Sequence, residues 1–280
     1  MISGIAAGAG RAAVRIALVG FGLVAASQAA TPLVPGGTTE LRVALPLELR
    51  ELAGDGKVAP VEHALVAVAV PADFSADRAW PVLVVNATTD AGFNSSRRLL
   101  DRYKDAALGA GWIVVAADPS PPASAREDQL TLRFALDLAA LAALQDAWKD
   151  AATSLVAFGG FSGGAKFSAG LAPLFARYGA RVVGVYMAGV NEDLLSVSAR
   201  RFGALDATFR RMPVFVQSAD SDRVATPAQH RAVAASLGDA GFVNVRVETV
   251  AGRHEVISEP LPAALRWFLS FSDAAASAPR

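Results

Sequence analysis

One stretch near the middle of the chain constrains the fold more than any other. The apolar run of residues 154–159 has the composition of a buried strand, and it leads directly into Gly-Phe-Ser-Gly-Gly at residues 160–164. A helical pattern follows at once, so the pattern G-x-S-x-G stands between a strand and a helix. This is the setting of a nucleophile elbow, a tight turn that lifts a serine hydroxyl above the edge of a sheet. Gly160 and Gly164 supply the small residues that allow strand and helix to come close.

Ser162 is therefore the candidate nucleophile. The next residue, Gly163, would offer a backbone N–H to an oxyanion that develops on a substrate carbonyl. An ordinary glycine-rich turn would fit the same five residues, because glycine and serine are common. The strand and helix on either side favour the elbow.

The length and composition favour one large α/β domain. The chain has 280 residues, 53% of them hydrophobic, which is enough for a sizeable core. The formal net charge is zero, which gives no reason to expect nucleic acid as a partner. The absence of cysteine excludes disulfides, thiol catalysis and zinc–thiolate sites. The remaining potential metal ligands do not have the spacing of a metal site.

Residues 1–30 have the pattern of a secretory signal peptide. Arg11 and Arg15 precede an apolar run over 16–26, and small residues follow, with cleavage expected after Ala29 or Ala30. The apolar run is shorter than the roughly 20 residues of a membrane-spanning helix. We therefore expect an exported protein, periplasmic or secreted, with one domain over residues 31–280 and no membrane span in the mature chain.

Strand and helix patterns alternate along most of that domain, which predicts a mostly parallel sheet with helices on both faces. Ser124 and Glu127 form a capping-box pattern that is expected to begin a helix reaching about Asp150. Residues 191–211 are polar and helical, and are expected to form a small cap over the site. Expected strands cover residues 41–45, 61–70, 81–86, 112–117, 154–159, 181–188, 213–218 and 243–250, and further helices cover 95–108 and 162–178, begin at 226, and cover 261–271.

A serine nucleophile needs a base, and the chain has three histidines. His254 follows the last expected strand, in a loop that opens on the same sheet edge as the elbow, so it is the candidate base. His63 lies inside an expected strand and His230 inside an expected helix, and both are interpreted as structural.

The acid that orients the base should lie between Ser162 and His254 in the sequence, because this arrangement runs serine, acid, histidine. Asp222 follows the strand of residues 213–218 and is the first choice. Asp220 is the alternative acid, Asp193 is a third candidate, and any of these residues could instead cap a helix. The second oxyanion donor should come from the loop after residues 81–86. We expect the Thr88 N–H there, with Ala87 or Thr89 as alternatives.

These residues resemble a known superfamily. The segment Gly159 to Ala165 and Asp222-Arg223-Val224 are similar to serine esterases of the α/β-hydrolase superfamily, in particular polyhydroxybutyrate-depolymerase-like, feruloyl-esterase-like and dienelactone-hydrolase-like proteins. The resemblance covers about residues 60–271. The chain has Ala219 where that pattern usually has glycine, and Asn86-Ala87 where it usually has His-Gly.

The resemblance implies the α/β-hydrolase fold, with a mostly parallel central sheet of about eight strands and helices on both faces. It also implies a carboxylic-ester hydrolase that needs no cofactor, with Ser162, Asp222 and His254 as a catalytic triad and with Gly163 and Thr88 as oxyanion donors. The substrate would be a small-molecule or polymeric ester. A peptidase or acyltransferase with the same triad, or a non-catalytic exported binding protein of the same fold, remain alternatives.

Overall fold

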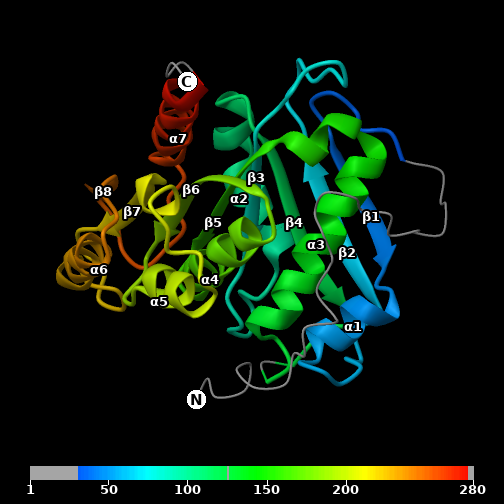
Figure 1. Ribbon diagram of the computed structural model, residues 1–280, viewed down its shortest axis with the longest axis horizontal. Helices are drawn as coiled ribbons and strands as arrows, with labels where there is room; N and C mark the ends of the chain where they lie inside the picture. The colour runs from blue at the N-terminus through cyan, green and yellow to red at the C-terminus, as the bar shows by residue number, and fades with distance from the viewer. Residues whose placement is uncertain (1–30, 125, 277–280) are drawn as a thin grey trace.

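A computed structural model describes residues 31–124 and 126–276 (Figure 1). The signal peptide expected at residues 1–30 lies outside the described residues. Within them, no helix is both long enough and apolar enough to cross a membrane.

A single sheet runs through the described part of the chain. It has eight strands in the order β1-β2-β4-β3-β5-β6-β7-β8, as Figure 1 shows. The strands β1 and β2 are antiparallel to their neighbours, and β4 to β8 with β3 are parallel. The expected mostly parallel sheet of about eight strands is therefore confirmed. The strands are β1 (Thr38–Ala44), β2 (His63–Ala69), β3 (Val82–Asn86), β4 (Ile113–Ser120), β5 (Leu155–Phe161), β6 (Arg181–Ala188), β7 (Val214–Ala219) and β8 (Val245–Val250).

Helices cover both faces of this sheet, and their buried side chains form two apolar cores. The helices are α1 (Leu47–Ala53), α2 (Ser96–Gly109), α3 (Leu130–Ala147), α4 (Gly163–Arg177), α5 (Leu194–Arg201), α6 (Pro227–Asp239) and α7 (Leu261–Ala276), with short 3₁₀ helices η1 (Lys149–Thr153) and η2 (Phe209–Arg211). The smaller core lies under α2 and α7, and the larger one lies under α1, α3, α4, α5 and α6.

The central strand β3 shows why its sequence is apolar without interruption. Val82 and Val84 face the larger core, whereas Leu83 and Val85 face the smaller one. All five residues of this strand are buried. A strand that is covered by helices on both faces has no solvent-exposed face, so its sequence does not alternate between apolar and polar residues.

Three local expectations need correction. The amide N–H of Ser124 does donate to the Glu127 carboxylate, at 2.9 Å, but this contact closes a turn and α3 begins only at Leu130. The seven-residue helix α1 was not expected, because its short apolar pattern lies between a proline and a glycine. The strand expected to end at Ala117 continues in β4 as far as Ser120, because it pairs with β2 over its whole length.

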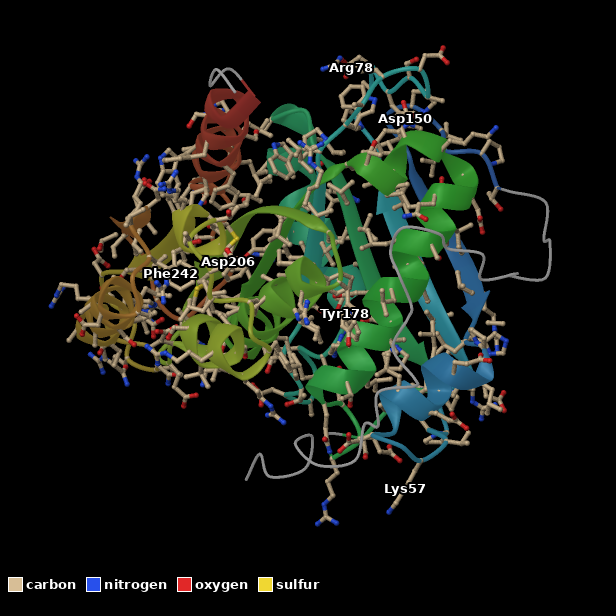
Figure 2. The ribbon with its side chains drawn as sticks, in the orientation of Figure 1. Lys57, Arg78, Asp150, Tyr178, Asp206 and Phe242 are labelled. Atoms are coloured by element: carbon tan, nitrogen blue, oxygen red, sulfur yellow. The ribbon has the colours of Figure 1, made fainter. Side chains whose placement is uncertain are left out.

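Residues 191–211, which were expected to form a cap, contribute α5 and η2 to the helical layer on the larger core. Leu195 and Ala199 are fully buried in that core. Phe209 packs edge-on against Phe242, which Figure 2 labels, with ring centroids 5.9 Å apart. This segment therefore stabilises the layer that also holds α4 and α6.

The strand order determines where a ligand can reach the sheet. From β3 the chain proceeds outward through β4 on one side, and from β5 it proceeds outward through β6 to β8 on the other. A crevice forms at such a reversal, beyond the carboxyl ends of the strands. The elbow follows β5 and the loop of residues 87–95 follows β3, so both lie at this crevice.

Candidate active site

Ser162 occupies the sharp turn between β5 and α4. Its backbone has φ 55° and ψ −121°, and among the described residues only Asp55 shares a positive φ without being glycine. A side chain at Gly160 would place its Cβ 2.4 Å from the Gly164 carbonyl carbon, and one at Gly164 would lie 1.9 Å from the Asn86 carbonyl oxygen. Only glycine can occupy these two positions, so the G-x-S-x-G pattern reports a real close approach. Strain of this kind is typical of functional sites.

His254 lies in the loop between β8 and α7, and its imidazole joins the other two candidate residues. Its Nε2 lies 3.0 Å from the Ser162 Oγ, and its Nδ1 lies 2.7 Å from the Asp222 Oδ2. These contacts fit the neutral tautomer in which Nδ1–H donates to the carboxylate and Nε2 accepts from the hydroxyl. The structure thus brings together Ser162, His254 and Asp222. Along the chain, His254 lies 92 residues from Ser162 and 32 residues from Asp222.

The carboxylate of Asp222 is almost fully buried, and its second oxygen is held by the backbone. Its Oδ1 accepts hydrogen bonds from the N–H groups of Val224 and Ala225, at 2.7 and 2.9 Å. Burial alone would raise the pKa of Asp222. The hydrogen bond from His254 and those two backbone N–H groups outweigh burial, so the pKa of Asp222 is lowered from its usual value. The carboxylate is therefore ionised at neutral pH and can stabilise a positive charge on His254.

The two other candidate acids serve different purposes. Asp220 accepts hydrogen bonds from the Ser221 hydroxyl and the Gly252 N–H, so it joins the loop after β7 to the loop after β8. Asp193 caps α5 and accepts a hydrogen bond from the Ser236 hydroxyl of α6. Neither carboxylate contacts His254.

The imidazole of His254 packs against Phe161, the residue that precedes Ser162. The two ring centroids are 4.7 Å apart. Gly189 lies against both rings, and a Cβ there would be 2.7 Å from the Phe161 ring and 3.2 Å from the His254 ring. The imidazole is therefore held by ring packing as well as by hydrogen bonds.

The two expected oxyanion donors, Gly163 and Thr88, lie against each other. A Cβ on Gly163 would meet the Thr88 Oγ1 at 2.5 Å. The same Thr88 hydroxyl donates a hydrogen bond to Asp90 Oδ2 at 3.0 Å. The N–H of Ala87, one alternative donor, already donates to the Ser96 Oγ at 3.2 Å. That hydrogen bond leaves the N–H groups of Thr88 and Thr89 as candidates for the second donor, and Thr88 is the one that lies against Gly163.

Sequence reasoning missed a group of buried polar side chains behind this loop. Arg133 and Asp137 of α3 are fully buried, and they reach Ser96 and Asn86 respectively. The one available signal was a pair of opposite charges four residues apart inside an otherwise apolar helix. Such a pair needs buried partners, because an unpaired charge in a core is costly.

The remaining histidines lie apart from the reacting atoms. His63 on β2 contacts Arg42 at 3.4 Å. His230 on α6 is fully buried, and neither ring nitrogen has a hydrogen-bond partner among the described residues. In the same described part of the chain, no group of three or more potential ligands is arranged to hold a metal ion.

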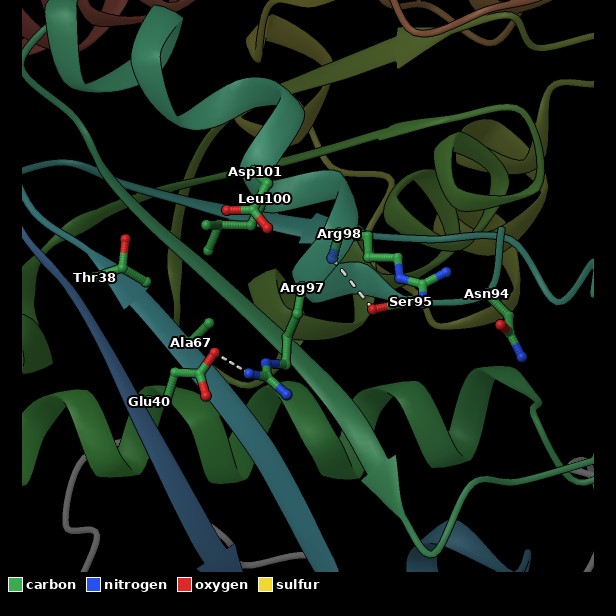
Figure 3. A pocket seen from close by; sticks show the side chains of 9 residues that line it. All are labelled: Thr38, Glu40, Ala67, Asn94, Ser95, Arg97, Arg98, Leu100 and Asp101. Atoms are coloured by element: carbon green, nitrogen blue, oxygen red, sulfur yellow. Dashed lines mark hydrogen bonds and ion pairs between the residues drawn. The ribbon is translucent and has the colours of Figure 1, made fainter. Parts of the chain in front are cut away.

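A polar hollow of about 430 Å³ lies between the first two strands and the start of α2 (Figure 3). Arg97 and Glu40 face each other across it and form an ion pair. None of the residues that line this hollow belongs to the triad, so we do not assign it to the candidate active site.

No protein-family model matches this sequence, and no curated protein matches it either. Solved structures do match the fold. An α/β serine hydrolase without a lid from Xanthomonas campestris has a TM-score of 0.57 at 15% identity, covering 86% of this chain and 98% of that one. A fungal esterase structure from Rhizomucor miehei has a TM-score of 0.54 at 16% identity, covering 88% and 85%.

A third structure is only partly matched. A bifunctional GH43-CE protein from Bacteroides eggerthii has a TM-score of 0.54 at 12% identity over 74% of this chain, and this chain spans only 36% of its length. At sequence identities this low, the similarity shows the fold alone. The chain has the α/β-hydrolase fold.

Proposed function

We propose that this protein, which has the α/β-hydrolase fold, hydrolyses carboxylic esters through a covalent acyl-enzyme on Ser162. One observation carries the proposal: a continuous hydrogen-bonded chain from Ser162 through His254 to Asp222, with the serine on a strained turn. A serine hydroxyl is a weak nucleophile at neutral pH, and this arrangement supplies both the base and the group that orients it.

The proposed reaction has two halves. His254 Nε2 takes the hydroxyl proton as the Ser162 Oγ attacks the ester carbonyl carbon. The N–H groups of Gly163 and Thr88 stabilise the oxyanion, and Asp222 stabilises the imidazolium. The imidazolium then gives its proton to the leaving alcohol, and the acyl group stays on the serine. In the second half His254 takes a proton from water, the resulting hydroxide attacks the acyl carbon, and the serine leaves with the proton.

Two similar structures support hydrolase chemistry, and one of them supports an ester as the substrate class. One is described as a fungal esterase and the other as a serine hydrolase without a lid. In this chain the segment that was expected to form a cap packs in the helical layer instead. An exposed aromatic side chain, Phe93, lies in the loop that carries Thr88 and offers an apolar contact for a substrate. We therefore expect small apolar acyl esters to be accepted.

The experiment measures turnover of p-nitrophenyl acetate and butyrate by the purified protein and by its Ser162→Ala variant. The variant should lose a factor on the order of 10⁶ in kcat, because the triad works as a unit. A fluorophosphonate probe should label the wild-type protein and leave Ser162→Ala unlabelled.

A matched control is Ser270→Ala, since Ser270 is an exposed serine of α7 whose hydroxyl only donates to the Trp267 carbonyl. It should keep full turnover and labelling. Turnover by Ser162→Ala at the wild-type rate would refute the proposal. The same panel should include short peptides and an alcohol acceptor, because preferred cleavage of peptides or acyl transfer would replace ester hydrolysis with one of its alternatives.

A further inference from the structure

Two ionisable side chains of α3 are buried as completely as the core around them. Arg133 has no exposed surface and Asp137 is 1% exposed. They are four residues apart, so they lie on the same face of the helix. That face meets the loop after β3, which carries the proposed second oxyanion donor.

Arg133 is fixed by a bidentate ion pair with Asp128. Its Nε and one terminal nitrogen donate to the two oxygens of Asp128, at 2.6 and 2.5 Å. The guanidinium carbon also lies 5.6 Å from the centre of the Phe167 ring of α4. These contacts leave the other terminal nitrogen with a fixed direction, and it donates to the Ser96 Oγ at 2.8 Å.

Ser96, the first residue of α2, connects this arginine to the backbone of the loop. Its Oγ also accepts the Ala87 N–H at 3.2 Å, and its own N–H donates to the Asp118 carboxylate at 2.6 Å. The residue before Ala87 is held in parallel, because the Asn86 amide donates to Asp137 at 3.0 Å. Two consecutive residues before Thr88 are therefore fixed by side chains that depend on α3.

We propose that Ser96 and Arg133 are positioning residues for the oxyanion site, because they hold the Ala87 N–H and so orient the next peptide toward Gly163. This inference rests on the proposed function. We call Ser96, Arg133 and Asp137 together the α3 clamp.

The energetics favour a role beyond stability. A buried ion pair is often no more stabilising than well-packed apolar residues of the same volume, so α3 would be expected to carry leucine here if only folding mattered. A hydrogen-bond donor that stabilises a transition state must instead be held in place before the reaction, so that no energy goes into ordering it. The α3 clamp provides that rigidity from a region that substrate and solvent do not reach.

The experiment compares Ser96→Ala with Ser154→Ala. Both serines are buried, Ser96 at the start of a helix and Ser154 next to the start of a strand, and both hydroxyls form hydrogen bonds. The hydroxyl of Ser154 contacts only the Asp150 carbonyl, at the opposite edge of the sheet. For Ser96→Ala we expect kcat on a p-nitrophenyl ester to fall about 10- to 100-fold, less than the 10²–10³ that follows direct loss of a donor. KM should change less than about threefold, and Ser154→Ala should match the wild type in both.

A second measurement separates positioning from mere loosening. A trifluoromethyl ketone forms a tetrahedral adduct whose oxyanion occupies the same site, so its inhibition constant should rise with Ser96→Ala by the factor lost from kcat/KM. Unchanged inhibition beside a lowered kcat would overturn the inference. Should Ser96→Ala not fold, Arg133→Lys serves instead, because lysine keeps a charge beside Asp128 but lacks the second nitrogen that reaches Ser96.

The outcomes for this inference and for the proposed function differ. A wild-type protein with no ester turnover and no probe labelling would overturn the proposed function and this inference with it. An active wild type whose Ser96→Ala variant behaves like Ser154→Ala would overturn only the positioning role.

Discussion

Two polar clusters flank Ser162 at the same edge of the sheet, and they are built in opposite ways. On one side His254 is partly exposed, on a loop after β8, and depends on the single carboxylate of Asp222. On the other side the α3 clamp is buried inside a helix layer, with one guanidinium among several carboxyl groups.

The difference follows from what each side has to do. As the proposed base, His254 would exchange protons with substrate and water, so it needs access and a carboxylate that stays ionised. A backbone donor exchanges nothing and only has to be in place, so complete burial of its support is tolerated. The comparison predicts that changes beside His254 act on the rate, whereas changes in the clamp also act on stability and its pH dependence.

Among the tests of this comparison, we expect Asp222→Asn to have the largest effect. The substitution keeps the shape of the side chain but removes the charge that stabilises the imidazolium and selects the Nδ1–H tautomer. We expect kcat to fall by a factor on the order of 10⁴, as in other serine triads. Ester turnover across pH 5–9 and urea unfolding at pH 7 together measure whether the loss lies in rate rather than in folding.

Asp220→Asn is the matched control, two residues away in the same loop. Asp220 contacts Ser221 and Gly252 but not the imidazole, so the rate should stay within a few-fold of the wild type. A loss of 10⁴ in Asp220→Asn, with Asp222→Asn nearly intact, would assign the acid to Asp220 and reverse the interpretation of this side of the site.

The two sides also differ in how far the sequence could predict them. The elbow was predictable from its G-x-S-x-G pattern between a strand and a helix. The contact that enforces glycine at 160 lies within the turn, whereas glycine at 164 is enforced by the Asn86 carbonyl at the end of β3. The imidazole and the acid were predictable by place, since each follows the carboxyl end of a parallel strand and these ends share one edge. The sequence placed Asp222 before Asp220 as the acid, and the folded loop after β7 shows that it is Asp222 that contacts the imidazole.

The α3 clamp could not be predicted, because its hydrogen bonds join α3 to the start of α2, 37 residues away, and to the end of β3, 51 residues away. No local pattern records which carboxylate meets Arg133. The start of α3 was misplaced for a related reason: the capping contact of Ser124 and Glu127 does form, but it belongs to a turn that brings Asp128 to the arginine. The local hydrogen bond was therefore predicted correctly, but the tertiary contact of Asp128 with Arg133 explains why it belongs to a turn and not to the start of the helix.

The second effect tests the clamp through Asp137→Asn. Burial raises the pKa of Asp137 to about 7, although the Asn86 amide and the Arg133 charge oppose the shift. The folded protein therefore keeps this proton between about pH 4 and 7, where the unfolded chain has lost it, so stability falls as pH rises through that range. At about 1.4 kcal/mol per pH unit, the wild type should lose on the order of 2–3 kcal/mol from this group between pH 5 and 7.

In Asp137→Asn that loss should disappear, because the amide has no proton to release. Urea unfolding of both proteins at pH 5, 6, 7 and 8 measures it, and the difference between the two free energies of unfolding should move in favour of the variant as pH rises. A difference that stays constant with pH would mean that Asp137 is ionised throughout, and that its buried charge is compensated by Arg133.

The smallest effect is expected on the side of the base, from His230→Leu, and it has the opposite sign. Burial lowers the pKa of His230 from 6.5, and the charge of Asp222 partly opposes that shift. The unfolded chain therefore binds a proton that the folded protein refuses, so the wild type loses stability as pH falls below about 6.5. Leucine removes this loss without leaving a polar atom unpaired, so the variant should gain stability over the wild type between pH 7.5 and 5.

Asp222 does not interfere in this range, because its lowered pKa confines its contribution to lower pH. The pH dependence of stability that comes from Asp137 is common to both proteins and cancels in the comparison. Parallel profiles of the two proteins over this range would show that His230 gains a partner for its proton in solution. In that case the region around His254 would also contain a buried polar network. The two polar clusters would then differ only in their access to solvent and substrate.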